Sequence, residues 1–196
     1  MHRILILTAV WMLTVGCICT APLNAPTAQN DRQADEYDVY AALINEKYVH
    51  GEVELIVIVD RTATGLGDDL DKTLEYVAES IPDVQKGTLG DFKTQNDQSY
   101  PLPDDFDLDV THRLISQQEM TEVFSEGDGW DEFYTKYPNS QGTMTLSRVG
   151  FNRKRDQALV YVGNQSHWLG GAGYYVLLAK ENQVWAIQSE VMVWIS

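Results

Sequence analysis

Alternating apolar positions near the C-terminal end of the chain predict the element around which the rest is organised. Successive side chains of a strand point to opposite faces, and residues 143–196 show this alternation in four runs joined in up-and-down order. Residues 157–163 and 174–179 are apolar at both parities, which indicates strands covered on both faces. The last run is expected to place five apolar side chains on one face: Trp185, Ile187, Val191, Val193 and Ile195.

The first of these four runs changes phase in its middle. Met144 and Leu146 share one parity, whereas the next apolar residue, Val149, has the other. A one-residue slip moves every later side chain to the opposite face, so a β-bulge or sharp bend is predicted at Ser147 and Arg148. The glycine-rich residues 165–173 are expected to form a long loop, and residues 181–182 a short hairpin turn.

Helical and extended patterns also occur earlier in the chain. Helices are predicted over 36–48, between Asp69 and Pro82, from the capping box at Ser116 and Glu119 to about residue 125, and over 130–137. A β-branched run at 52–60 and alternation at 108–115 predict two strands, whereas residues 83–106 are expected to be irregular. The predicted class is α+β: a curved antiparallel sheet, made of the C-terminal four-strand meander and one or two earlier strands, covered by N-terminal and middle helices.

The N-terminal residues are typical of a segment that directs export. Residues 1–16 combine a basic start with an apolar run too short to span a bilayer, and Gly16-Cys17 resembles the cleavage site of bacterial lipoproteins. In such proteins Cys17 becomes the lipidated first residue; simple secretion is the alternative. Residues 17–35 are expected to be a flexible tether and residues 36–196 a single α+β domain. The expected location is the bacterial membrane, as an anchored lipoprotein, or the periplasm or medium.

Composition restricts the partners and cofactors. With 14 Lys and Arg against 29 Asp and Glu, the net charge is −15, which repels nucleic acid. The cysteines are Cys17 and Cys19, so residues 36–196 form neither a disulfide nor a thiolate zinc site. Histidine spacing does not suit a metal, and the acidic clusters at 68–71, 104–109 and 126–132 are interpreted as solvated surface. Expected partners are a membrane, through the anchor at Cys17, and a protein or small molecule, with no nucleic acid, metal or cofactor.

Several motifs resemble those of a family of uncharacterised exported bacterial proteins. They are Trp130-Asp-Glu-Phe-Tyr, Tyr137-Pro-x-Ser-x-Gly142, Leu146-Ser-Arg-Val-Gly-Phe-Asn152, Ala158-Leu-Val-Tyr-Val-Gly163, Gly171-x-Gly-Tyr-Tyr and Trp194-Ile-Ser196. The similarity runs from about Tyr37 to the C-terminus, and it implies no established activity. The pattern Leu-Leu-x-Lys-x-x-x-x-Trp at 177–185 is similar to nuclear transport factor 2-like and cystatin-like folds, which wrap helices against a curved antiparallel sheet.

Five residues are candidates for a ligand site: Arg148, Tyr161, His167, Trp168 and Tyr174. His167 and Trp168 lie in the predicted glycine-rich loop, where they either contact a ligand or cover the edge of the core. Arg148, at the predicted bulge, either holds an anionic group of a ligand or pairs with an acidic residue of a helix. No catalytic residue is predicted, because Ser147, His167 and Asp156 lack the Gly-x-Ser-x-Gly pattern of a nucleophile elbow.

These observations lead to functions of different classes. The first is a non-catalytic envelope protein, lipid-anchored, that binds a partner or small ligand with its curved sheet. The alternative is an enzyme acting on a small apolar ligand in a pocket of a cone-shaped α+β fold, and a protease-inhibitor-like protein would follow from a cystatin-like shape alone. A cavity between the N-terminal helix and the sheet would favour the enzyme, and side chains packed solid there would disfavour it.

Overall fold

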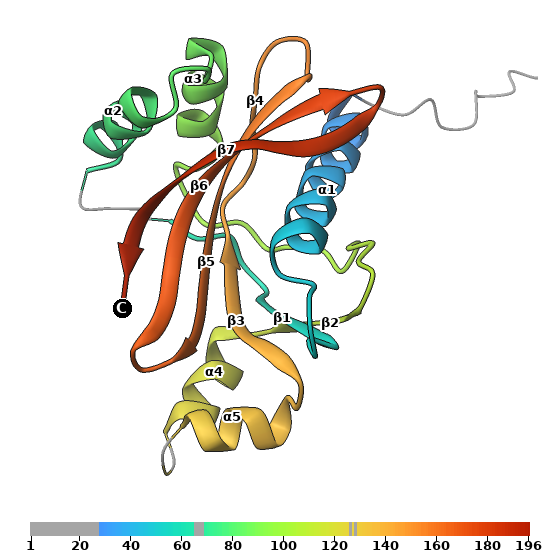
Figure 1. The fold of residues 1–196 in the computed structure, drawn as a ribbon, viewed down its shortest axis with the longest axis vertical. Helices are drawn as coiled ribbons and strands as arrows, with labels where there is room; N and C mark the ends of the chain where they lie inside the picture. The colour runs from blue at the N-terminus through green and yellow to red at the C-terminus, as the bar shows by residue number, and fades with distance from the viewer. Residues whose placement is uncertain (1–27, 65–68, 126, 128) are drawn as a thin grey trace, which may run out of the picture.

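The computed structural model describes residues 28–64, 69–125, 127 and 129–196. In this part of the chain the predicted α+β class is confirmed: seven strands form an open sheet, and five helices lie on both sides of it (Figure 1). The helices are α1 (Ala28–Lys47), α2 (Leu70–Ser80), α3 (Lys86–Gln95), α4 (Gln117–Phe124) and α5 (Trp130–Lys136). The strands are β1 (Leu55–Val59), β2 (Thr111–Ile115), β3 (Ser140–Leu146), β4 (Gly150–Phe151), β5 (Gln157–His167), β6 (Gly170–Glu181) and β7 (Val184–Ile195).

The strand order is β2-β1-β3-β5-β6-β7, with β4 paired to β5. The predicted C-terminal meander is confirmed, because β3, β5, β6 and β7 pair antiparallel in turn. The earlier strands differ from the prediction, because β1 is parallel to both β2 and β3 and the sheet is therefore mixed. Parallel neighbours need long crossover connections. Here α2 and α3 connect β1 to β2, and α4 and α5 connect β2 to β3.

Helices cover both faces of the sheet, as the apolar character of β5 predicted. Val160 is fully buried in the cluster that includes α1, and the adjacent Leu159 is fully buried in the cluster under α2 and α3. The α1 side chains that face the sheet have no exposed surface: Val39, Tyr40, Leu43 and Ile44. The middle of α1 is therefore packed solidly against the sheet, which leaves no room for a ligand between the two.

The break between β3 and β4 confirms the bend predicted at Ser147 and Arg148. Strand β3 ends at Leu146 and pairing with β5 resumes at Gly150. Ser147 keeps contact with β5, since its N–H donates to the Tyr161 carbonyl at 3.0 Å and its Oγ accepts from Tyr161 N at 2.8 Å. The hydroxyl thus replaces a ladder carbonyl and lets the chain turn outward at Arg148.

Strand β7 does not keep one apolar face, contrary to the prediction. Its pairing with β6 shifts register twice, before residue 189 and after residue 192, with one extra residue in β7 each time. Trp185 and Ile187 consequently pack with the α1 cluster, whereas Val191 and Val193 pack with the α2 and α3 cluster, and Ile195 is exposed. Alternating residues share a face of the sheet only while the register of the strand is unbroken. Each bulge moves the residues that follow it to the opposite face.

Helix α3 lies inside residues 83–106, which were expected to be irregular. Two of its ten residues are glycines, which lower its helix propensity. Tertiary contacts therefore stabilise this helix. Phe92 is fully buried, and a Cβ added at Gly150 would overlap Phe92, so the helix lies directly on the backbone of β4. At the other end, Gln157 Oε1 accepts hydrogen bonds from Gln85 N and Thr88 Oγ1, both at 2.8 Å.

Helix α1 begins at Ala28, so residues 28–35, predicted to belong to the tether, are helical. Contacts from distant elements hold these first turns. Arg32 Nη2 donates to Asp91 Oδ2 at 2.9 Å, and Asp35 pairs with Arg155 at 3.0 Å and Lys180 at 2.8 Å. Cys17, the rest of the predicted tether and the predicted export signal lie outside the described residues. Among the described helices, none has both the length and the apolar character that crossing a bilayer requires.

The glycine-rich residues 165–173 are not a long loop, contrary to the prediction. Strands β5 and β6 run to His167 and from Gly170, which leaves a two-residue turn. Gly173 is explained by Trp194 on β7, because a Cβ at Gly173 would overlap the indole ring. Trp194 Nε1 crosses the glycine backbone and donates to Tyr161 Oη at 2.7 Å. Because glycine has no side chain, the indole ring of Trp194 can pack directly against the backbone at Gly173.

Candidate functional site

A cleft of about 410 Å³ opens beside the N-terminal half of α1. The C-terminal end of α3 and the segment 100–103 form its other walls, and the break between β3 and β4 supplies Arg148. Its volume falls in the range of small-molecule pockets, roughly 300–1,000 Å³. The polar side chains that line it include Arg32, Glu36, Tyr37, Gln95, Tyr100 and Arg148.

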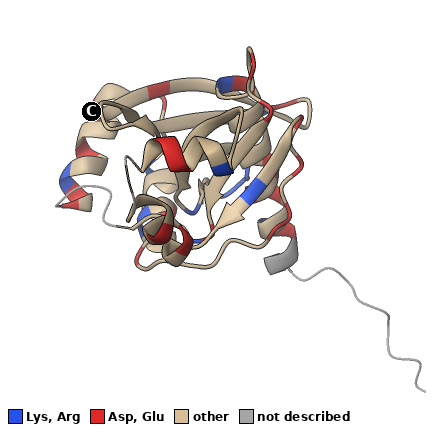
Figure 2. Ribbon diagram, turned by 90° about the horizontal axis from the view of Figure 1, so that it is seen from below, with Lys and Arg blue, Asp and Glu red and all other residues tan. Residues whose placement is uncertain are grey.

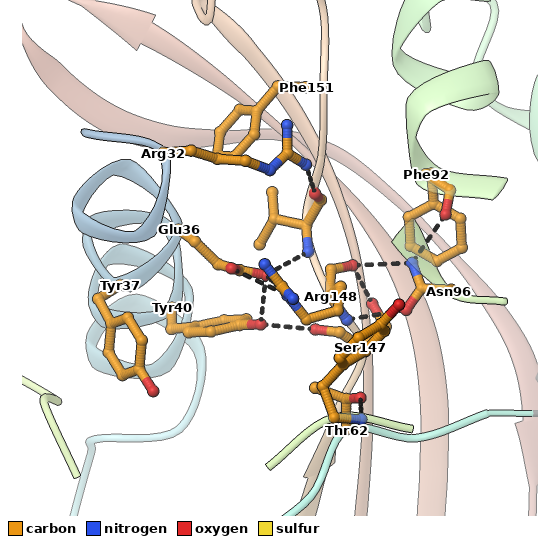
Figure 3. A network of polar contacts seen from close by, with 12 residues as sticks. Arg32, Glu36, Tyr37, Tyr40, Thr62, Phe92, Asn96, Ser147, Arg148 and Phe151 are labelled. Carbon is orange, nitrogen blue, oxygen red and sulfur yellow. Dashed lines mark hydrogen bonds and ion pairs between the residues drawn. The ribbon is translucent and has the colours of Figure 1, made fainter. Parts of the chain in front are cut away.

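Glu36 lies at the base of this cleft and is 3% exposed. Its carboxylate accepts from Arg148 Nε at 2.7 and 3.0 Å and from Val149 N at 2.8 Å, as Figure 3 shows. Tyr40, one helical turn further on α1, has its hydroxyl 3.0 Å from the same carboxylate. A buried carboxylate needs such partners, since burying a lone charge is costly.

Arg148 is held between this carboxylate and an aromatic ring. Its side chain is 23% exposed, and its Cζ atom lies 5.2 Å from the centroid of the Tyr100 ring. Burial acts to lower the pKa of Arg148, but the hydrogen bond and charge of Glu36 outweigh it and the pKa is raised. Arg148 is therefore a fixed cation on the wall of the cleft.

The backbone of the strand break is fully engaged by side chains from other elements. Asn96, just after α3, donates from Nδ2 to the Arg148 carbonyl at 3.1 Å and accepts from Arg148 N at 2.8 Å. The Tyr40 hydroxyl lies 2.7 Å from the Ser147 carbonyl oxygen. Burial, and then the charge of Glu36, raise the pKa of Tyr40 well above its ordinary value, so it stays a neutral donor. These contacts fix the position from which Arg148 extends.

The walls of the cleft are also fixed. The Tyr37 hydroxyl donates to the Pro103 carbonyl at 2.6 Å, and Tyr100 N donates to Thr62 Oγ1 at 2.9 Å. Arg32 bridges α1 to the strand break, since its Nη2 lies 2.7 Å from the Val149 carbonyl oxygen. The result is a preformed recess with aromatic and proline walls and cationic and amide groups at its surface.

The five residues predicted to bind a ligand do not come together in one pocket. Arg148 lines the cleft, and the ion pair with a helix residue that was one of its two interpretations is present, with Glu36 as partner. Tyr161 lies on the face covered by α2 and α3, whereas Tyr174 packs with the α1 cluster. The two tyrosines therefore lie on opposite faces of the sheet, although both belong to paired central strands.

His167 and Trp168 lie at the β5–β6 turn. This turn lies at the other end of the strands from the N-terminal half of α1, beside which the cleft opens (Figure 1). The centroid of the Trp168 ring lies 6.0 Å from the ring centroid of Phe124 and 6.3 Å from that of Trp130. Trp168 therefore covers the edge of the cluster formed by α4 and α5. The His167 ring is stacked 6.4 Å from that of Trp130. This geometry matches the interpretation in which the tryptophan covers a core edge.

Sequence reasoning missed Glu36, Tyr100 and Asn96 as parts of the cleft. The spacing of Glu36 and Tyr40 indicates that they share a face of α1. No local pattern pairs Glu36 with a residue 112 positions later, however. Tyr100 and Asn96 lay in the stretch expected to be irregular.

A second polar cluster, around Glu119, joins β2, α4 and α5 outside the cleft. Glu119 accepts from Lys136 at 2.8 Å, from the Tyr137 hydroxyl at 2.6 Å and from Arg113 at 3.2 Å. Hydrogen bonds from Lys136 and Tyr137 lower the pKa of Glu119 to about 2. Because every charge in it has a partner within the fold, we interpret the cluster as structural.

The acidic residues that the structure describes are dispersed rather than gathered as metal ligands. Within the described residues, no group of three or more His, Cys, Asp or Glu side chains has the arrangement of a metal site. Asp69 instead caps α2, accepting from the N–H groups of Asp71 and Lys72, and Asp104 pairs with His112 at 2.7 Å. Figure 2 shows acidic and basic segments interspersed over helices, strands and loops.

Comparison of the chain with protein-family models, with curated proteins and with solved structures found no match. The resemblance to exported bacterial proteins therefore stays a prediction, and the geometry of the cleft carries the functional argument.

Proposed function

We propose that this protein is a lipid-tethered binding protein of the bacterial cell envelope, and that the cleft beside α1 holds a small ligand. The observation that carries the proposal is the preformed cleft, in which Glu36 and Tyr100 hold Arg148 in place. A binding site whose side chains are already ordered loses less conformational entropy when the ligand arrives. The first turns of α1 line the cleft, so the ligand would bind where the predicted tether joins the fold.

A binding role fits these side chains better than catalysis does. The carboxylate of Glu36 is surrounded by donors from Arg148, Val149 and Tyr40. A carboxylate held in this way orients its neighbours, whereas a general base must have access to the substrate proton. An enzyme that uses Glu36 on a small ligand is the second candidate, favoured by the burial of this carboxylate at a cleft.

The tether is tested by metabolic labelling with radioactive palmitate in a bacterial host. The wild type and Cys19→Ala should be labelled and found with the membrane, and Cys17→Ala should be unlabelled. Normal labelling of Cys17→Ala, or no label on the wild type, would contradict the anchor.

The cleft is tested by screening a panel of acidic, basic and neutral metabolites by NMR. Ligands should shift the signals of Tyr100 and Gln95, and Gln95→Trp, which fills the cleft, should abolish the shift at Tyr100. Gln118→Trp, on exposed α4, is the matched control and should bind normally. A panel without any effect on cleft signals, or binding that survives Gln95→Trp, would refute the proposed site.

A further inference from the structure

The guanidinium group of Arg148 has one edge to which no described residue hydrogen-bonds. Both Glu36 oxygens contact Nε, and neither Nη1 nor Nη2 hydrogen-bonds to the part of the chain that the structure describes. Neither of these atoms is a buried group without a partner, so both reach solvent, which at this position is the cleft. Both terminal nitrogens of this partly buried arginine therefore have N–H donors that a ligand can reach.

The unused edge has the geometry of a carboxylate site. The two terminal nitrogens of an arginine form a planar fork whose parallel N–H bonds match the two oxygens of a carboxylate. Here the fork is already oriented, because Glu36 fixes Nε and the Cζ atom lies over the ring of Tyr100. Charge-assisted hydrogen bonds of this kind are roughly twice as strong as neutral ones.

The remaining walls define the rest of the ligand. Beside Arg148 the cleft is lined by the rings of Tyr37 and Tyr100 and by the segment 101–103, which contains two prolines and a leucine. Gln95 adds an amide at the end of α3, and its side chain makes no hydrogen bond with the described residues. Such a recess suits a compact molecule with an apolar or planar body and one acidic end.

Both cations of the cleft lining already have carboxylate partners, so a bound anion would depend on the free donors of Arg148 rather than on an excess of positive charge. Arg32, a second cation in the lining, is shared between Asp91 and the Val149 carbonyl. The Glu36 carboxylate lies on the Nε side of Arg148. An anion on the Nη side would therefore contact the N–H donors of Nη1 and Nη2 before it came close to this carboxylate. Added salt should weaken the contact only modestly, because the attraction acts over a direct contact, and salt also screens the repulsion of an anion by the net negative charge of the protein.

We propose that the cleft recognises small organic acids, with the ligand carboxylate bound to Nη1 and Nη2 of Arg148 and its body against Tyr37 and Tyr100. The inference rests on the proposed binding function and specifies its ligand class. Arg148 would thus have two roles: its Nε completes the fold and its fork selects the ligand.

The test compares benzoate with benzamide, which has the same shape without the charge. Binding of each is measured on the full chain, from the NMR signals of Tyr100 and of the Arg148 Nε–H group. Benzoate should bind at least tenfold more tightly than benzamide. Equal binding of the two, or no binding of benzoate, overturns the proposal.

Two variants separate recognition from folding. Arg148→Lys keeps a cation beside Glu36 but lacks the fork, and should weaken benzoate at least tenfold. Gln95→Glu leaves the ion pair intact and places a negative charge in the lining, and should weaken benzoate at least threefold without affecting benzamide. Gln118→Glu carries the same charge change on exposed α4 and should bind like the wild type. Unchanged benzoate affinity in Gln95→Glu contradicts the proposal even if Arg148→Lys fails to fold.

The results for benzoate and for the metabolite panel distinguish a failure of this inference from a failure of the proposed binding function. If neutral members of the metabolite panel shift the cleft signals and benzoate does not, the carboxylate specificity is wrong and the binding function stands. If no panel member shifts these signals, the proposed binding function itself fails.

Discussion

The Glu36 carboxylate lies 2.7 Å from Nε of Arg148, although 112 residues separate the two in the chain. The pair joins the first helix to the interruption between β3 and β4, and the cleft opens beside it. One contact thus joins the helix to the sheet and holds a cation at the wall of the cleft.

We expect Glu36→Gln to destabilise the protein by about 3 kcal/mol, because it leaves a half-buried arginine without its counter-ion. Urea unfolding at pH 7 measures the loss. Glu190→Gln is the control, since it removes the more exposed pair between Lys47 and Glu190 and should cost less than about 1 kcal/mol. Equal losses for the two variants would show that the Glu36 pair is no more important than a surface contact.

Ser147→Ala should cost about 1–3 kcal/mol, since Tyr161 N would lose its acceptor and stay buried. Ser125→Ala removes a hydroxyl at the exposed end of α4 and should change the stability by less than about 0.5 kcal/mol. Thermal unfolding of both variants checks the difference. A Ser147→Ala protein as stable as the wild type would mean that the hydroxyl does not replace a ladder carbonyl.

Gly173→Ala should displace Trp194 and destabilise the protein by about 2 kcal/mol, because the added Cβ overlaps the indole ring. The indole N–H signal of Trp194 should move as its hydrogen bond to Tyr161 is lost. Gly90→Ala makes the same change in α3, where a Cβ meets nothing within 4 Å, and should stabilise by about 0.5–1 kcal/mol. A Gly173→Ala variant with an unmoved indole signal would argue against this packing.

Acid should weaken the Glu119 cluster within a defined pH range. The pKa of Glu119 is lowered from 4.5 to about 2 by the hydrogen bonds from Lys136 and Tyr137, so the folded state binds the proton more weakly than the unfolded state. The stabilisation is complete above pH 4.5 and is lost as the pH falls through 2. Glu119→Gln should be less stable than the wild type at pH 6, and the difference should disappear near pH 2. A difference that is independent of pH would contradict this account.

Local patterns in the sequence were sufficient for most of the secondary structure. Alternation located the C-terminal strands, the change of parity after Leu146 located the break at Ser147, and Ser116 caps α4 as its spacing with Glu119 predicted. Each of these signals depends on residues within one turn or one strand, so it can be recognised in the sequence without knowledge of the tertiary structure.

Tertiary contacts decided the features that the local pattern could not contain. Helix α3 forms despite its glycines because Phe92 is buried against Gly150, and the bulges of β7 move its side chains between two cores. The cleft depends on the pairing of α1 with the strand break, between residues that share no periodicity. Local sequence patterns were enough for most of the elements, for the bend and for the acidic character of the protein. The fold alone decided that the bend meets Glu36 and Tyr100, because burying a charge requires a partner that only the packed chain brings within reach.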